Sequence, residues 1–379
     1  QQWLRKVFAE MQNLHGRQDI EVEHLDRIRD AIRSEIVTHT NLNLLNAEIK
    51  QSQFRMTEIQ IQIMSGLKGN ERIVVAGGAG TGKTFLAVEA AKSQREEGDS
   101  VLVITPGDAL MHHVEAQEGM WGIPVCTPSE LPLPTGKVDC IVIDEAQDLM
   151  DYEIHEIFEQ NIKGGIKNGK WRIFLDPNNQ SMLRGRFDVA TYNDVCAAAS
   201  LEPFLLRLNC RNTDKTISWV QMLSGADIGN PTVMHGAEPN IRFLDSEEAE
   251  EQLEKDLDDL LDNAVQPGAI TILSPDPDAS IALQTAERLN RHMIRFSPEQ
   301  VTGTERSKIK IASPLEFKGL ENDYIFFIDV ENYTETEKKL SELYVSLTRA
   351  TVKFTTYFPK EHEDQIKQTI IENTKAEPQ

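Results

Sequence analysis

A glycine-rich segment that follows a short apolar run is the feature that most narrows the fold of this chain. Residues 73–84 have the sequence IVVAGGAGTGKT, which fits the pattern GxxxxGK[ST] between a strand-like run and a helix-forming run. Glycines let consecutive backbone N–H groups turn towards phosphate oxygens, and the start of the following helix adds a partial positive charge. The segment therefore predicts a phosphate-binding strand–loop–helix unit rather than a glycine-rich turn without a ligand.

The pattern gives each residue of this loop an expected task. We expect Lys83 to reach the β- and γ-phosphates of ATP, and the Thr84 hydroxyl to bind Mg²⁺, which prefers hard oxygen ligands. The loop backbone around the phosphates is expected to come from Gly77, Gly78, Ala79, Gly80, Thr81 and Gly82.

Short β-rich runs alternate with helical stretches along most of the chain. The first series is RIVVA, SVLVIT, DCIVID and WRIFLD, and a second series after about residue 205 is NIRFLD, AITILS, KIKIAS and DYIFFIDV. Such alternation indicates parallel sheets with crossover helices. We predict an α/β fold with a helical appendage at residues 1–50, a first lobe at 51–204, and a second lobe with a C-terminal helix at 205–379.

Composition excludes several classes of protein. Apolar residues make up 40% and charged residues 26% of the chain, which is typical of folded globular proteins. No stretch approaches the roughly 20 apolar residues of a transmembrane helix. The histidines lack metal-binding spacing, and we expect His112 and His113 on a solvated helix face. The cysteines lack CxxC spacing and predict a reduced, cytoplasmic protein; they are Cys126, Cys140, Cys196 and Cys210.

The formal net charge of −22 argues against broad, nonspecific binding to nucleic acid, because such binding depends on Lys and Arg. It leaves a local basic track open, since net charge does not say where positive groups lie. The chain begins with Gln1 rather than Met, so we expect its natural start upstream; a nuclease partner or a domain in that upstream segment is then compatible with the sequence.

Two acids follow another apolar run, in the sequence IVIDEAQD at residues 141–148. Asp144 suits the shell of Mg²⁺, and Glu145 suits a base that orients water against the γ-phosphate. Alone, adjacent acids could simply begin a helix, whose N-terminal end favours carboxylates. About sixty residues after a phosphate-binding loop, the catalytic interpretation is favoured.

The loop and the string DEAQD together resemble UvrD/Rep-like superfamily 1 helicases, and other motifs of that family follow in order. The resemblance spans residues 56–350 and implies two RecA-like P-loop NTPase lobes with the nucleotide between them. The similar segments are MTEIQ ending at Gln60 (the Q-motif), Thr105-Pro106 (motif Ia), LDPNNQS with Gln180 (motif III), LNCRNT with Arg211 (motif IV), FKGLE with Gly319 and Glu321 (motif V), and YVSLTRA with Arg349 (motif VI).

The resemblance also implies roles for these residues. Gln60 is expected to recognise the adenine edge through its amide, and Gln180 to contact the γ-phosphate. Arg211 and Arg349 are expected to reach across the cleft and stabilise transition-state charge, although a lone arginine in such a string would otherwise be a surface ion pair. In the family the glutamate at the position of Glu321 holds the ribose.

The chain departs from the family on the side that meets nucleic acid. Only about forty residues separate Thr105 from DEAQD, which leaves little room for the large helical insertions of full helicases. Met182 stands where the family has a base-stacking aromatic residue, and Leu315 where it usually has histidine. Basic residues near motif III could line a track or a solvated face; they are Lys170, Arg172, Arg184 and Arg186.

Three functions remain in competition. The preferred one is an ATP-hydrolysing motor that acts on single-stranded nucleic acid, with DNA as the substrate and 3′–5′ polarity following the family. The alternative is a regulatory ATPase switch that controls a partner or fused nuclease in repair or anti-phage defence, with little unwinding of its own. A small-molecule kinase would explain Lys83 and Asp144 but leave Gln60, Arg211 and Glu321 without roles.

Overall fold

The computed structural model describes residues 69–132, 134, 136–151, 153–176, 187–233, 236–301 and 307–375. All of them belong to the compact unit Ala47–Gln379. The expected helical appendage at residues 1–50 lies outside the described residues, as do Gln60, Gln180 and Met182.

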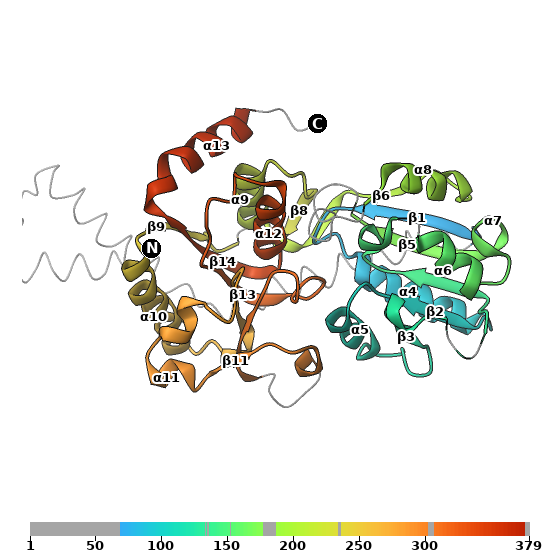
Figure 1. Ribbon diagram of the computed structural model, residues 1–379, viewed down its shortest axis with the longest axis horizontal. Helices are drawn as coiled ribbons and strands as arrows, with labels where there is room; N and C mark the ends of the chain where they lie inside the picture. The colour runs from blue at the N-terminus through green and yellow to red at the C-terminus, as the bar shows by residue number, and fades with distance from the viewer. Residues whose placement is uncertain are drawn as a thin grey trace, which may run out of the picture. The chain divides into compact units, whose positions relative to one another are not determined.

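The first sheet has six strands, and the glycine loop follows one of its interior strands, β1 (Arg72–Gly77; Figure 1). Every neighbouring pair is parallel. The strand order is β3 (Val125–Cys126), β2 (Val101–Ile104), β4 (Cys140–Ile143), β5 (Lys170–Leu175), β1 (Arg72–Gly77) and β6 (Phe204–Leu206).

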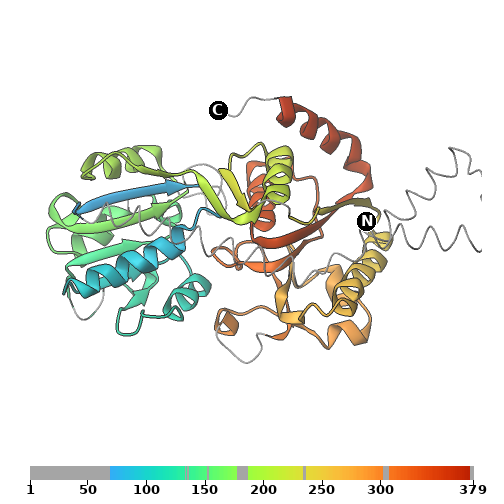
Figure 2. The same ribbon diagram turned by 180° about the vertical axis from the view of Figure 1, so that it is seen from behind.

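Alternate side chains of these strands enter different apolar cores, because neighbouring residues of a strand point to opposite faces of the sheet. On β1, Val74 packs into one core, whereas Ile73 and Val75 pack into the other. Helices α4 (Lys83–Glu96) and α5 (Asp108–Glu115) cover the face of Ile73 (Figure 2). The face of Val74 is covered by α6 (Glu153–Asn161), α7 (Gly165–Asn168) and α8 (Val189–Ala198).

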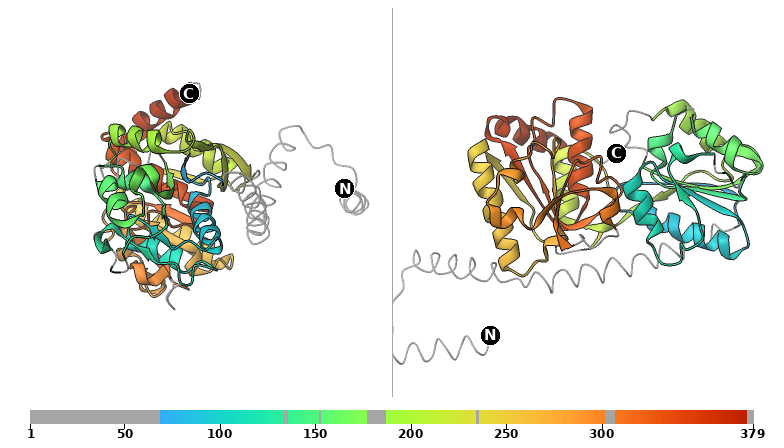
Figure 3. Two further views of the ribbon diagram at one scale, coloured as in Figure 1. Left: turned by 90° about the vertical axis from the view of Figure 1, so that its right-hand side faces the viewer. Right: turned by 60° about the horizontal axis from the view of Figure 1, so that its bottom comes forward.

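The second sheet repeats this architecture with six parallel strands. Figure 3 shows both sheets in turned views, with helices packed on them. Its order is β11 (Met293–Arg295), β12 (Ile309–Ala312), β10 (Ile270–Leu273), β13 (Asn322–Phe327), β14 (Ala350–Pro359) and β9 (Asn240–Leu244).

Helices lie on this second sheet too. Three of them share one apolar core with the strands: α9 (Asp214–Ser224), α12 (Glu337–Thr348) and α13 (Glu363–Lys375). The acidic helix α10 (Ser246–Asp262) packs on β14, where its Asp256 accepts a 2.8 Å hydrogen bond from the Tyr357 hydroxyl. A short helix, α11 (Glu287–Asn290), precedes β11. The α/β fold with parallel sheets is confirmed.

A two-stranded parallel ribbon, β7 (Leu208–Thr213) and β8 (Asn230–Val233), belongs to neither large sheet. Residues 204 and 205, between which the sequence suggests a boundary, both lie in β6 of the first sheet. The segment that resembles motif IV is therefore the strand β7, which follows the first sheet directly.

Within the described residues, none of the helices combines the length and the apolar character that crossing a membrane requires.

Candidate active site

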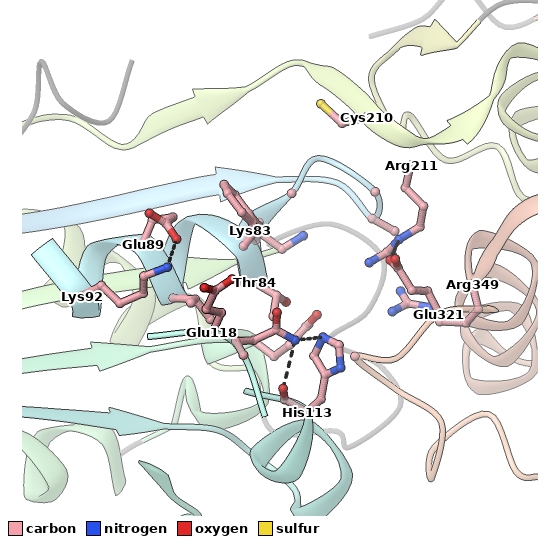
Figure 4. A pocket seen from close by; sticks show the side chains of 18 residues that line it. Lys83, Thr84, Glu89, Lys92, His113, Glu118, Cys210, Arg211, Glu321 and Arg349 are labelled. Carbon is pink, nitrogen blue, oxygen red and sulfur yellow. Dashed lines mark hydrogen bonds and ion pairs between the residues drawn. The ribbon is translucent and has the colours of Figure 1, made fainter. Parts of the chain in front are cut away.

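A cavity of about 480 Å³ lies where the first sheet faces β7 and the second sheet. Figure 4 shows Lys83 and Thr84 on one side of it, and Arg211, Glu321 and Arg349 on the other. Of the residues expected to form the site, the cavity is lined by Ala79, Gly80, Gly82, Lys83, Thr84, Glu145, Arg211, Gly319, Glu321 and Arg349. Segments that are far apart in sequence thus meet around one space of the size that small-molecule ligands occupy.

The loop after β1 has the geometry that its glycines permit. Gly80 and Gly82 have φ angles of 81° and 83°, in the left-handed region that favours glycine. The buried Lys83 donates from Nζ to the carbonyls of Gly77 (2.8 Å) and Gly78 (2.9 Å). The helix α4 begins at Lys83, so its positive N-terminal end faces the cavity.

The remaining loop residues shape it from within. Thr81 is buried, and its hydroxyl donates to the Gly78 carbonyl over 2.8 Å. A Cβ atom on Gly77 would lie 2.6 Å from that hydroxyl oxygen, so the close approach requires glycine. Gly77, Gly78 and Thr81 therefore hold the loop's form rather than line the cavity.

Asp144 follows β4 and is fully buried behind the cavity wall. Burial, together with the neighbouring charge of Glu145, raises the pKa of Asp144 to about 7, against the opposing influence of the Thr84 hydroxyl and Lys83. The ionised form of Asp144 therefore lacks sufficient compensating positive charge in its surroundings. A bound divalent cation would stabilise this ionised form.

The donors around Asp144 fit Mg²⁺. The carboxylate and the Thr84 hydroxyl, which are hydrogen-bonded to each other, are hard oxygen ligands. Among the described residues there is no group of three or more His, Cys, Asp or Glu that could hold a metal ion by itself. An ion here would complete its shell with phosphate oxygens and water, as Mg²⁺ does in nucleotide sites.

Glu145 is held in an unusual backbone conformation at the cavity wall. Its φ is 50°, in the left-handed region, which is uncommon for a residue with a Cβ atom. Its carboxylate accepts a hydrogen bond from Gln147, whose other amide atom accepts from the Asp176 N–H at 3.0 Å. Burial opposes its ionisation, but the charges of Lys83, Lys318 and Arg349 outweigh burial and lower the pKa of Glu145.

The opposite wall carries two arginines. Arg211, on β7, donates from Nε to Glu321, whose side chain is 47% exposed towards the cavity. Desolvation by the surrounding walls opposes ionisation of Glu321, but the charge and hydrogen bond of Arg211 outweigh it and lower the pKa of Glu321. Arg349 follows α12 and is 1% exposed. Burial, with the charge of Arg211, lowers the pKa of Arg349 to about 10, while Glu145 counteracts both. Arg349 therefore remains a cation at neutral pH, close to a carboxylate of the opposite wall.

Two further contacts join the two sheets beside the cavity. Lys318 Nζ lies 2.6 Å from Asp148 Oδ1, and both side chains are buried. A Cβ atom on Gly319, whose φ is 86°, would lie 3.0 Å from a methyl group of Leu110 on α5. Gly319 thus lets the segment before β13 approach the first sheet closely.

The structure corrects the expectation for one basic residue, Arg172. Arg172 is buried and donates to the carbonyls of Glu71 (2.7 Å) and Trp171 (3.0 Å), so it forms neither a binding track nor a solvated face. Lys170 forms a 2.6 Å ion pair with Asp99. Arg172 and Lys170 both lie on β5, so their positions follow from the pairing of that strand in the first sheet. Arg184 and Arg186 lie outside the described residues.

His113 was expected on a solvated helix face, and it lies on helix α5, partly buried, where it lines the cavity. Burial and Arg211 lower its pKa, and the charge of Glu321 counteracts them. The sequence of the helix does not indicate this position, because the cavity is formed by segments distant in sequence. Other lining residues that the sequence did not indicate are Phe85, Val88, Glu89, Lys92, Gln117, Glu118 and Cys210.

Comparison with protein families matches residues 70–260, just over half of the chain, to the model described as Schlafen group 3, DNA/RNA helicase domain. Comparison with curated proteins gives no match.

Three solved structures are similar at low identity. The PRRSV helicase is similar over 78% of this chain and 53% of its own, with 11% identity and a TM-score of 0.43. Arterivirus nonstructural protein 10 (helicase) is similar over 79% of this chain and 61% of its own, with 13% identity and a TM-score of 0.41. The C-terminal domain of a possible DNA helicase from Lactobacillus plantarum WCFS1 is similar over 40% of this chain and 87% of its own, with 15% identity and a TM-score of 0.32. The chain spans less than two thirds of the first two proteins, and likenesses this distant carry no argument about function.

Proposed function

We propose that this chain, which belongs to the family of Schlafen group 3 DNA/RNA helicase domains, hydrolyses ATP with Mg²⁺ in the cavity between its two sheets. The observation that carries the proposal is the opposition of Lys83 and Thr84 to Arg211 and Arg349 across one cavity. Phosphoryl transfer depends mainly on positioning and on stabilising charge, and both walls offer groups for that purpose.

In this proposal the first sheet binds the triphosphate and activates water. Lys83 and the backbone of the glycine loop hold the phosphates, and Mg²⁺, held by Thr84 and Asp144, would neutralise charge that develops on them. Glu145 orients the attacking water and accepts its proton. Its ionised state and its bond to Gln147 support that role.

The second sheet and β7 then complete the site. Arg211 and Arg349 stabilise the charge that grows on the γ-phosphate as its bond breaks. Glu321, adjacent to Arg211 and beside Gly319, holds the ribose hydroxyls. Gln180 as a γ-phosphate contact and Gln60 as the reader of adenine follow the motif resemblance alone.

For the use of hydrolysis we propose movement along single-stranded DNA with 3′–5′ polarity, following the resemblance to UvrD/Rep-like helicases. A site whose two walls come from different sheets supports such coupling, because nucleotide can change how the walls meet.

The second candidate is a regulatory ATPase switch that acts on a nuclease partner or on a domain encoded upstream. The burial of Arg172 within the protein favours it, since this arginine is not available to phosphates of a nucleic acid. So does Leu315, which is exposed where the family usually has histidine.

Steady-state ATP hydrolysis, measured with and without single-stranded DNA or RNA, separates these proposals. The Lys83→Ala variant, which lacks the phosphate-binding amine, provides the background rate. A motor predicts hydrolysis stimulated by a single strand, followed by displacement of an annealed strand; a switch predicts hydrolysis without displacement. Wild-type hydrolysis at the Lys83→Ala level would overturn both.

A further inference from the structure

One residue of the glycine loop, Ala79, lines the cavity, and both of its backbone polar groups are bonded to residues distant in sequence. The Ala79 N–H donates to the Tyr344 hydroxyl of α12 over 3.0 Å. The Ala79 carbonyl accepts from the Asn209 side-chain amide of β7, also over 3.0 Å. Asn209 and Tyr344 are 0% and 1% exposed. The glycine loop is thus bonded both to helix α12 and to strand β7, through contacts that involve no nucleotide.

Tyr344 also connects this loop to the end of β5. Its hydroxyl donates to the Asp176 carboxylate over 3.1 Å while it accepts from Ala79. Burial, together with Asp176, raises the pKa of Tyr344 well above its usual range, so the hydroxyl stays protonated and can make both bonds. Asp176 is the second residue of LDPNNQS, the segment that resembles motif III.

Asn209 and Asn212 continue the connection to Arg349. The Asn209 side-chain oxygen accepts from the Asn212 N–H at 2.9 Å, and its amide lies 3.2 Å from the Asn212 side-chain oxygen. Asn212 then donates to the carbonyls of Thr348 (3.0 Å) and Ala350 (2.8 Å), the residues on either side of Arg349.

Arg211 lies between the two asparagines and shares their attachment. Its backbone N–H is 3.2 Å from both the Asn209 side-chain oxygen and the Gly80 carbonyl. A Cβ atom on Gly80 would lie 2.5 Å from the side-chain oxygens of Asn209 and Asn212, so the loop and β7 are in close contact. Both arginines are therefore fixed to the glycine loop through buried polar groups.

We propose that Asn209, Asn212 and Tyr344 are positioning residues that hold Arg211 and Arg349 in register with the phosphate-binding loop. This inference rests on the proposed ATP hydrolysis but concerns residues to which no role in it has been assigned. A fully bonded buried network favours one arrangement strongly, because every lost partner leaves a desolvated polar group behind. Small displacements of catalytic groups cost much rate, so loosening the network should affect turnover more than binding.

The Tyr344→Phe variant tests the network, since it removes one hydroxyl and keeps the ring. Its matched control is Tyr333→Phe. Tyr333 is equally buried in the same apolar core of the second sheet, and its hydroxyl has no hydrogen-bond partner among the described residues. We expect Tyr344→Phe to lower kcat about 10- to 100-fold with little change in KM. Tyr333→Phe should keep wild-type values.

Combination with Arg211→Ala and Arg349→Ala distinguishes positioning from a general loss of structure. If Tyr344 acts through the two arginines, Tyr344→Phe should have little further effect on kcat once both arginines are replaced. Multiplying effects in this combined variant, or equal losses in Tyr344→Phe and Tyr333→Phe, would overturn the proposal.

Amide hydrogen exchange tests the same connection without catalysis. In the free protein, Tyr344→Phe should speed exchange at Arg211 and Asn212, which bond to Asn209, while Tyr333→Phe leaves them unchanged. If the wild type hydrolyses no ATP, the proposed function fails, and this exchange measurement alone decides whether the network joins loop and arginines. Unchanged exchange at both amides would refute the connection.

Discussion

The two six-stranded parallel sheets meet the cavity with opposite edges. The first sheet presents the carboxyl ends of its strands, with the glycine loop after β1 and Asp144 after β4. The second sheet presents amino ends, since Glu321 precedes β13 and Arg349 precedes β14. Ligands of open α/β sheets usually bind at carboxyl ends, and here that rule describes one wall only.

Helix ends make the same contrast in electrostatic terms. The first sheet turns the N-terminal end of α4 to the cavity, where a helix attracts phosphate. The second sheet turns the C-terminal end of α12, which favours the cation that follows it, Arg349. The first wall is thus suited to bind a phosphate. The second wall is suited to hold Arg349, a cation that can stabilise the negative charge of the transition state. Loss of the second wall should therefore affect rate more than affinity.

The largest effect is expected at the second wall. Arg349→Ala should lower kcat by about 10³- to 10⁵-fold while nucleotide affinity changes little, because the guanidinium is needed mainly in the transition state. Arg211→Ala should act in the same direction. Arg291→Ala, which removes an exposed arginine paired with Glu287, is the matched control. Unchanged kcat in both cavity variants would mean that the walls do not share one site.

At the first wall, Glu145→Gln should lower kcat by about 10²- to 10⁴-fold, since an amide accepts no proton from water. ATP binding should persist, because Lys83 and the loop are intact. Equilibrium binding of a fluorescent ATP analogue, measured beside turnover, separates the two quantities. Near-normal turnover would remove Glu145 from its assigned role.

The residues of the candidate site differ in how well the sequence alone predicts them. The glycine loop, Asp144 and Glu145 were predictable because they are contiguous with an apolar strand, and local pattern alone places them. The sequence analysis did not predict the strand β14, an interior strand of the second sheet, because its run TVKFTTYF follows the arginine motif without a turn signal. The sequence does not predict the roles of three residues within the matched motifs, Tyr344, Asn209 and Asn212, because each bonds to a partner more than a hundred residues away.

A smaller effect is expected for base selectivity. Gln60 lies outside the described residues, and its role stays a prediction. Gln60→Ala should reduce the preference for ATP over GTP by roughly 5- to 150-fold, the equivalent of about 1–3 kcal/mol for a paired amide contact. The ratio of kcat/KM for the two nucleotides measures it. Equal use of ATP and GTP by the wild type would contradict the assignment.

The smallest effect is expected at the amino ends of the first sheet's strands. We expect residues there to affect stability only, whereas the amino ends of the second sheet's strands face the cavity. Asp139 precedes β4, and bonds from Lys163 and Ser100 lower the pKa of its carboxyl. A lowered folded-state pKa stabilises the fold above the usual value of 3.8 and loses that contribution as the pH falls below it. Asp139→Asn should lower Tm at pH 7 by about 1–3 °C, since surface pairs contribute little.

The difference in Tm between wild type and Asp139→Asn should shrink as the pH falls below 3.8, and ATP turnover should be unaffected. A large loss of turnover would show that this edge also serves the site, against the contrast between the two sheets.

Mixing two inactive variants tests most directly whether both walls of one chain form the site. Glu145→Gln lacks the carboxylate of the first wall that we propose to orient water, and Arg349→Ala lacks the cation of the second wall. With an active wild type in the same assay, we predict that an equimolar mixture hydrolyses ATP no faster than either variant alone. Recovery of a substantial part of the wild-type rate would mean that the arginine comes from another copy of the chain, and would contradict a site closed by the two sheets of one molecule.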